Sequence, residues 1–90
     1  MLAIIKFINY DFNHEITVCA VTDNEETAKI ILQNEIENEK EIQEKCCIHY
    51  DTVEETETSY EAYNMGYKSD VGVHICIADT HYYDKIEKNS

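Results

Sequence analysis

The order of apolar and polar residues divides the chain into four short segments typical of strands and one long segment typical of a helix. Residues 2–10 are rich in β-branched and aromatic types, and residues 15–22 follow them after the turn-forming segment 11–14. These two runs predict a hairpin. Residues 54–63 and 71–78 each alternate between apolar and polar types, and each predicts one half-buried strand.

Between the two pairs of strands, the period of apolar residues changes to that of an α-helix. Asp23 is predicted to be the N-cap, with Glu26 completing a capping box. Four apolar residues then recur on one helix face: Ala28, Ile31, Leu32 and Ile36. Glu35 and Glu39 interrupt the same face. The first half of the helix is therefore expected to pack on a sheet, while residues 37–45 are either solvated or contact something other than the core.

These segments predict a single α+β domain with the order β-β-α-β-β. Its architecture is expected to have two layers, with one long helix lying across a four-stranded antiparallel or mixed sheet. Ninety residues leave room for one domain. We assign residues 1–82 to that domain and expect residues 83–90 to form a frayed C-terminal tail.

The first predicted strand is apolar on both of its faces, so its orientation decides which residues remain outside. If Ala3, Ile5 and Phe7 face the helix, three aliphatic residues face outward: Leu2, Ile4 and Ile8. Three residues of the last strand would lie beside them: His74, Cys76 and Ala78. Such a face has two explanations. Either a small chain leaves some aliphatic residues exposed or covers them with its folded-back tail, or the face is the surface of a homodimer or other partner.

The net charge of the chain is −12, and all seven of its cationic side chains are lysines. A nucleic-acid-binding protein or a protein bound to an anionic membrane would need a basic patch, so the charge argues against both classes. Apolar runs are also far shorter than the roughly 20 residues of a membrane span. No secretory signal pattern opens the sequence, which favours a cytoplasmic location.

Acidic residues are concentrated in residues 35–61, which contain ten carboxylates and two lysines. If residues 54–63 form one strand, Glu55, Glu57 and Glu61 recur along it at multiples of about 6.6 Å. Such a row is comparable in spacing to the phosphates of a nucleic-acid strand. The other interpretation is that the acidic residues only keep the protein soluble. The residues predicted to bind a basic partner are Glu37, Glu41, Glu44, Glu54, Glu55, Glu57, Glu61, Tyr63 and Tyr67.

The four cysteines are expected to be reduced thiols, because adjacent Cys46 and Cys47 rarely bridge and no secretory signal is present. Cys46, Cys47, His49 and Cys76 offer soft ligands for zinc, but only Cys46 and His49 have the usual spacing of a ligand pair. A negative environment disfavours the thiolate that cysteine catalysis requires. With two glycines and no phosphate-binding motif, the chain is expected to have no cofactor and no enzymatic activity.

In its size, acidity, lack of arginine and compact α+β pattern, the chain resembles the small inhibitors encoded by phages and mobile elements, such as anti-CRISPR proteins and other nucleic-acid mimics. This resemblance implies a protein that binds a basic, nucleic-acid-handling enzyme of a defence system, such as a CRISPR nuclease, and blocks its substrate channel. Two alternatives stay open. The first is that the chain is a structural or regulatory homodimer whose acidity serves solubility. The second is that it is a zinc-stabilised module.

Overall fold

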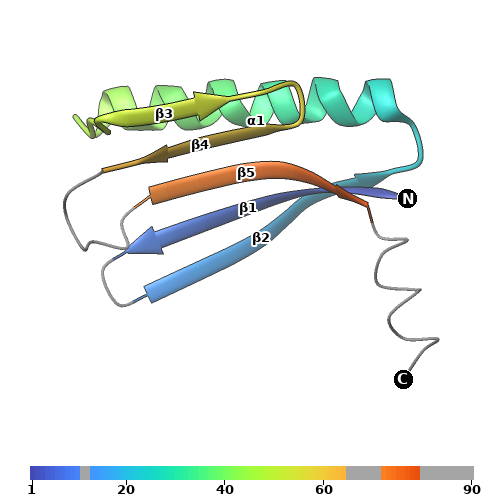
Figure 1. Cartoon of the computed structure of the whole chain (residues 1–90), viewed down its shortest axis with the longest axis horizontal. Coiled ribbons are helices and arrows are strands. Elements are labelled where there is room, and N and C mark those ends of the chain that lie inside the picture. Colours follow the sequence, from blue (N-terminus) through green and yellow to red (C-terminus); the bar gives the residue numbers. More distant parts are fainter. Residues whose placement is uncertain (11–12, 65–71, 80–90) are drawn as a thin grey trace.

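The computed structural model describes residues 1–10, 13–64 and 72–79, and in them it places one helix and five strands (Figure 1). The elements are β1 (Leu2–Tyr10), β2 (Asn13–Thr22), α1 (Glu25–Lys45), β3 (Thr52–Glu55), β4 (Ser59–Tyr63) and β5 (Gly72–Asp79). The α+β class and the single long helix are confirmed, whereas the predicted number of four strands is wrong. The expected tail at 83–90 lies outside the described residues.

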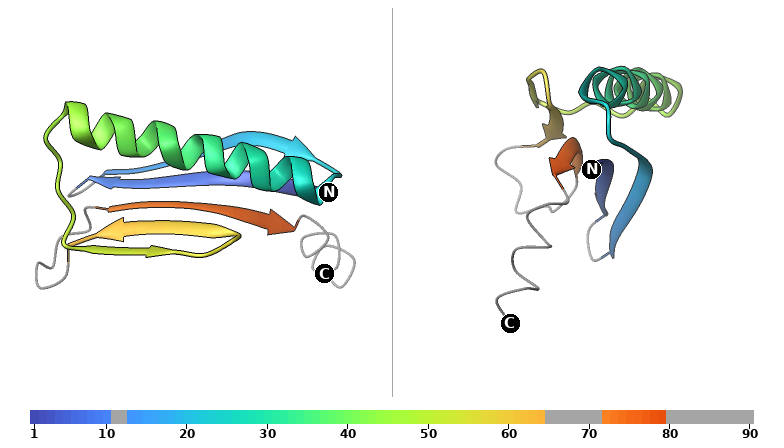
Figure 2. Two further views of the ribbon diagram at one scale, coloured as in Figure 1. Left: turned by 90° about the horizontal axis from the view of Figure 1, so that it is seen from above. Right: turned by 90° about the vertical axis from the view of Figure 1, so that its right-hand side faces the viewer.

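All five strands belong to one antiparallel sheet with the order β2-β1-β5-β4-β3. Helix α1 packs on one face of this sheet and contacts β5, β1 and β2. The sheet curves so that the β3–β4 hairpin rises beside the helix (Figure 2, right). The opposite face, turned away from α1, is called the outer face below.

The fifth strand arises because a turn divides the segment 54–63, which was expected to be one strand. The Thr56 N–H donates to the carbonyl oxygen of Ser59 at 2.8 Å and closes a hairpin. The Thr56 hydroxyl also accepts the Thr58 N–H at 3.2 Å and lies 2.9 Å from the Ser59 hydroxyl. Threonine and serine hydroxyls can therefore form this turn without glycine or proline.

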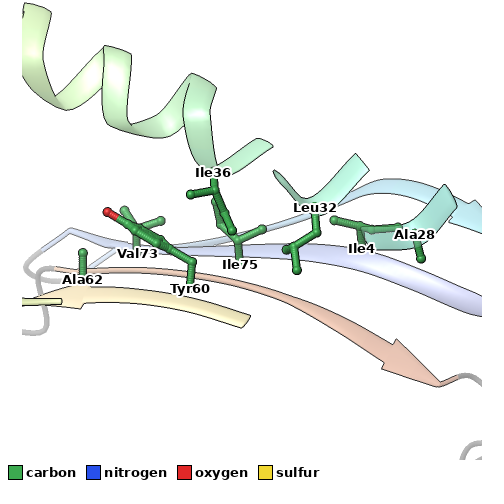
Figure 3. Close-up of a cluster of buried hydrophobic side chains, with 8 residues drawn as sticks. All are labelled: Ile4, Ala28, Leu32, Ile36, Tyr60, Ala62, Val73 and Ile75. Carbon is green, nitrogen blue, oxygen red and sulfur yellow. The ribbon is translucent and has the colours of Figure 1, made fainter. Parts of the chain in front are cut away.

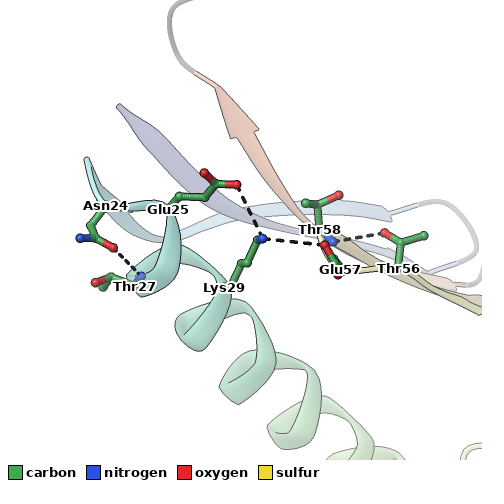
Figure 4. A network of polar contacts seen from close by, with 7 residues as sticks. All are labelled: Asn24, Glu25, Thr27, Lys29, Thr56, Glu57 and Thr58. Carbon is green, nitrogen blue, oxygen red and sulfur yellow. Dashed lines mark hydrogen bonds and ion pairs between the residues drawn. The ribbon is translucent and has the colours of Figure 1, made fainter.

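The helix begins one residue later than the sequence predicted. Asn24, rather than Asp23, is the N-cap, and its side-chain oxygen accepts the Thr27 N–H at 2.9 Å (Figure 4). Its backbone is extended, as a cap requires, and its own N–H donates to the Thr22 hydroxyl at 3.2 Å. Asp23 therefore lies one residue outside the cap.

At its other end, α1 stops without glycine. Cys46 is the C-cap, and Cys47 adopts the left-handed conformation with φ 56°. The Cys47 N–H donates to the carbonyl of Glu44 at 3.2 Å, and the Ile48 N–H donates to the carbonyl of Gln43 at 2.8 Å. These two bonds form a Schellman motif, in which glycine usually occupies the position of Cys47.

The core lies between α1 and the sheet (Figure 3), and it shows that the predicted orientation of β1 is wrong. Ile4 is fully buried beneath the helix, and Leu2 and Ile8 pack against the same cluster. These three residues, predicted as an outward dimer face, therefore belong to the core side. The remaining fully or nearly fully buried members of the cluster come from α1, β4 and β5: Ala28, Leu32, Ile36, Tyr60, Ala62, Val73 and Ile75.

A buried ion pair explains this orientation of β1. Lys6 lies on the same face of the strand as Ile4, and its Nζ is 3.0 Å from Oε2 of Glu39, a helix residue only 5% exposed. Gln43 Nε2 lies 3.4 Å from both Glu39 Oε1 and the Tyr60 hydroxyl. The second half of α1 is therefore attached to the sheet by polar contacts. Glu39, which interrupts the apolar face of the helix, is buried against the sheet and is not solvated.

The two edges of the sheet differ in character. Strand β2 forms one edge and leaves Ile16 66% and Val18 58% exposed. They lie on the outer face, opposite Phe7 and Ile5 of β1 respectively. The other edge is the short strand β3, whose charged residues protect it from pairing with another sheet. An apolar outer face is therefore present, but its β1 residues are Ile5 and Phe7 and not the predicted Leu2, Ile4 and Ile8.

Candidate protein-binding surfaces

Every lysine in the described part of the chain is already paired with a carboxylate. Lys6 is buried against Glu39, whereas the other three lysines form four exposed pairs at the helix surface. Those pairs join Lys29 to Glu25 at 3.6 Å and to Glu57 at 3.8 Å, Lys40 to Glu55 at 3.0 Å, and Lys45 to Glu41 at 3.2 Å. Glu37, Glu44 and Glu54 are exposed carboxylates that pair with none of these four lysines.

The first negative surface is a stripe of glutamates along α1, here called the acidic ridge. Glu37, Glu41 and Glu44 are exposed and follow the i, i+4, i+7 spacing of one helix face. That face is opposite the one that buries Leu32 and Ile36. The structure therefore brings together the three helix residues predicted to bind a partner. Only Glu41 has a lysine partner within the described residues.

The glutamates of β3 and β4 do not form the continuous row that the sequence predicted. Glu55 pairs with Lys40 of the helix. Glu57 pairs with Lys29 of the helix (Figure 4). Glu61 lies on the outer face, directly opposite Glu54 in the β3–β4 register. The predicted row is wrong because the turn at residues 56–58 separates its members.

The second negative surface lies on the outer face and includes Tyr63. The pKa of Tyr63 is raised above its usual value by desolvation, and further by the negative charges of Glu54, Glu61 and Asp51. Tyr63 and these acids therefore share one electronegative region. Tyr67, predicted as the second contact tyrosine, lies outside the described residues.

Beside this region, the outer face contains an open hollow of about 600 Å³. Phe7 and His74, which are register partners on β1 and β5, stack their rings at 5.8 Å between centroids and 29° between planes. His74 Nδ1 also lies 3.9 Å from Glu61 Oε2. The hollow is lined by Phe7, Asn9, Glu61, Tyr63, His74 and Cys76, among others. The outward positions of His74 and Cys76 were predicted correctly, whereas Phe7 was missed because β1 was oriented the wrong way.

The cysteines do not come together as a metal centre in the residues that the structure describes. Cys46, Cys47 and His49 are exposed after the helix, while Cys76 lies on β5, and no group of three metal-binding side chains is found there. Burial raises the pKa of the Cys76 thiol. The pKa of Cys19 is raised by burial and by the adjacent Glu35 carboxylate. Both shifts decrease the fraction of reactive thiolate.

In the residues that the structure describes, the fold is of the α+β class, with one helix on a curved antiparallel sheet. No protein-family model, curated protein or solved structure matches the chain at a significant level. Within the described residues, no helix has the length and apolar character needed to cross a lipid bilayer.

Proposed function

We propose that the protein is a non-enzymatic binding module that inhibits a nucleic-acid-handling enzyme of a host defence system. In this proposal, the acidic ridge enters the basic groove that normally holds the nucleic acid, and the protein itself binds no nucleic acid. The observation that carries the proposal is the stripe of Glu37, Glu41 and Glu44 on the helix face opposite the core.

The shape and spacing of the ridge suit this role. Helix α1 lies on top of the sheet as a convex rod (Figure 2), so a groove can receive its exposed side. Glu37 and Glu44 are seven residues apart, which corresponds to about 10.5 Å along the helix axis. Three phosphate steps of one nucleic-acid strand span roughly the same axial distance, at about 3.4 Å each. Groove lysines and arginines placed for phosphates can therefore meet carboxylates on the ridge.

The charge distribution supports fast, salt-dependent association. The chain carries a net charge of −12, and the lysines in its described part are occupied by internal ion pairs. A basic enzyme is therefore attracted over a distance of about one Debye length, which is about 8 Å at physiological ionic strength. The raised pKa values of Cys19 and Cys76 agree with a role that uses no cysteine nucleophile.

The first experiment captures partners from host lysate on the immobilised protein at low and high salt, and identifies them by mass spectrometry. The captured enzyme is then purified, and its binding to labelled nucleic acid is measured with increasing amounts of the protein. We expect the protein to displace the nucleic acid and to lose this effect at high salt. If a purified captured enzyme keeps its nucleic acid at saturating protein, the proposal is refuted.

The variant Glu37→Lys/Glu44→Lys tests the ridge directly. Neither residue has an ion pair in the described part of the chain, and both are exposed, so the fold should be retained. At position 44, in the last turn of α1, lysine also interacts favourably with the helix dipole. The matched control compares the single variant Glu44→Lys with Glu15→Lys, which makes the same charge change at an exposed β2 position away from the ridge and from the helix N-terminus. We expect the ridge variant to lose inhibition and the control to keep it. Equal loss in both would show that net charge, and not the ridge, determines binding.

A further inference from the structure

The hollow on the outer face combines aromatic surface with negative charge that the described lysines do not neutralise. Phe7 and His74 form its stacked rings, and Tyr63 and Glu61 lie at the same hollow. Glu54 lies directly across from Glu61 on β3. Two carboxylates in such a cross-strand pair repel one another, and this repulsion is relieved when a cation lies between them.

We propose that this hollow binds an arginine side chain presented by a partner protein. It lies on the outer face, whereas the acidic ridge lies on the far side of the helix, so the protein has two separate binding surfaces. The inference does not depend on the proposed inhibition, because it uses none of the ridge residues.

Arginine fits the hollow better than lysine for two reasons. The guanidinium group is planar and can stack on Phe7 or Tyr63 while its N–H groups bond to the carboxylate of Glu61. Its donors can also engage both oxygens of one carboxylate, which a lysine ammonium does with poorer geometry. At about 600 Å³, the hollow also has room for the residues that flank the arginine.

The composition of the chain indicates that the arginine comes from another protein. The sequence contains no arginine, so a second copy of this chain cannot supply the guanidinium group. The raised pKa of Tyr63, caused in part by Glu54 and Glu61, is consistent with a local excess of negative charge that favours a cationic ligand.

The experiment is an NMR titration of the full chain, labelled with ¹⁵N, with the peptide acetyl-Ala-Arg-Ala-amide. The matched peptide contains citrulline, which keeps the shape of arginine but lacks its charge, and a third contains lysine. We expect the arginine peptide to shift the amide signals of Phe7, Tyr63 and His74, and to bind at least roughly tenfold more tightly than the citrulline peptide. The lysine peptide is expected to bind with intermediate affinity.

The variant Glu54→Gln/Glu61→Gln should decrease arginine-peptide affinity to the level of the citrulline peptide. Because the substitution also removes a like-charge pair, it should not unfold the sheet. The control Glu15→Gln/Glu26→Gln makes the same charge change at exposed positions outside the hollow and the ridge, and should leave the affinity unchanged. Equal affinity for arginine and citrulline, absence of any shift, or shifts concentrated on the ridge would each overturn the inference. The inference would also be overturned if the amide signals of the hollow shifted with protein concentration in the absence of peptide, because a second copy of the chain would then cover the outer face. None of these results would affect the proposal for the ridge.

Discussion

The ion pair between Lys6 and Glu39 provides the sharpest test of how the helix is held on the sheet. Its two side chains are only 15% and 7% exposed, and their charged atoms lie 3.0 Å apart. Replacing Lys6 by methionine keeps most of the side-chain volume and leaves the Glu39 carboxylate buried without its cation. Removing one partner of a buried pair costs about 3–5 kcal/mol.

The lower end of that range is expected here, because Gln43 still lies within 3.4 Å of the Glu39 carboxylate and Lys6 is not completely buried. A loss of about 3 kcal/mol is large for a chain of 90 residues, whose total stability is about 4.5–13.5 kcal/mol at the usual value per residue. At about 4–8 °C per kcal/mol, Tm should fall by roughly 12–24 °C. Urea unfolding followed by circular dichroism measures the free energy directly.

Two further variants separate the buried charge from other effects. Lys29→Met breaks exposed contacts with Glu25 and Glu57 and should cost less than about 1 kcal/mol. The double variant Lys6→Met/Glu39→Leu removes both charges and should recover most of the lost stability, because apolar replacements of buried pairs are often neutral or stabilising. The reasoning is refuted if Lys6→Met is no more destabilising than Lys29→Met, or if the double variant is as unstable as the sum of its single changes.

Four other predictions concern individual positions. Asn24→Ala removes the helix cap and should decrease the free energy of unfolding by about 1 kcal/mol, measured by urea titration. Gly72→Ala would place its new Cβ 2.9 Å from a backbone carbonyl oxygen of β4, so we expect a loss of about 1–3 kcal/mol; a neutral result would contradict this geometry. Cys47→Gly should raise the free energy of unfolding by up to about 1 kcal/mol, since glycine adopts a φ of 56° without strain. Because the Glu35 carboxylate contributes to the raised pKa of Cys19, Glu35→Gln should lower that pKa and speed alkylation of Cys19 at mildly alkaline pH, as followed by peptide mass spectrometry; an unchanged rate would exclude the contribution of Glu35.

The sequence predicts the helix and the last strand well, because each has one clear period of apolar residues. It predicts the first hairpin from two β-branched and aromatic segments separated by a turn-forming segment. The orientation of β1 was not predictable in the same way, since both of its faces are apolar. The predicted orientation, with Ala3, Ile5 and Phe7 toward the helix, would place Lys6 on the outward face, where most lysines lie. Its inward position depends on Glu39, a residue 33 positions away that is brought opposite only by the fold.

The candidate surfaces were predictable in part. The spacing of Glu37, Glu41 and Glu44 depends only on the helix, and the structure places all three on one exposed helix face. That these residues bind a partner stays a prediction. The predicted row of strand glutamates required residues 54–63 to form one continuous strand. The turn at 56–58 contains no glycine or proline, so the sequence pattern does not indicate it. The hollow requires residues from β1, β4 and β5 together, which no local pattern indicates.

The open edge at β2 has a consequence for how the protein behaves as a colloid. Ile16 and Val18 belong to an edge strand of ten residues and are more than half exposed. An exposed apolar edge strand favours pairing with the sheet of another molecule. At neutral pH, two copies each carrying −12 repel one another before these strands can meet. Near the isoelectric point of about 4.5 this repulsion vanishes. Acidification should therefore cause the protein to precipitate or form fibrils, and the same charge that serves binding also keeps the chain dispersed.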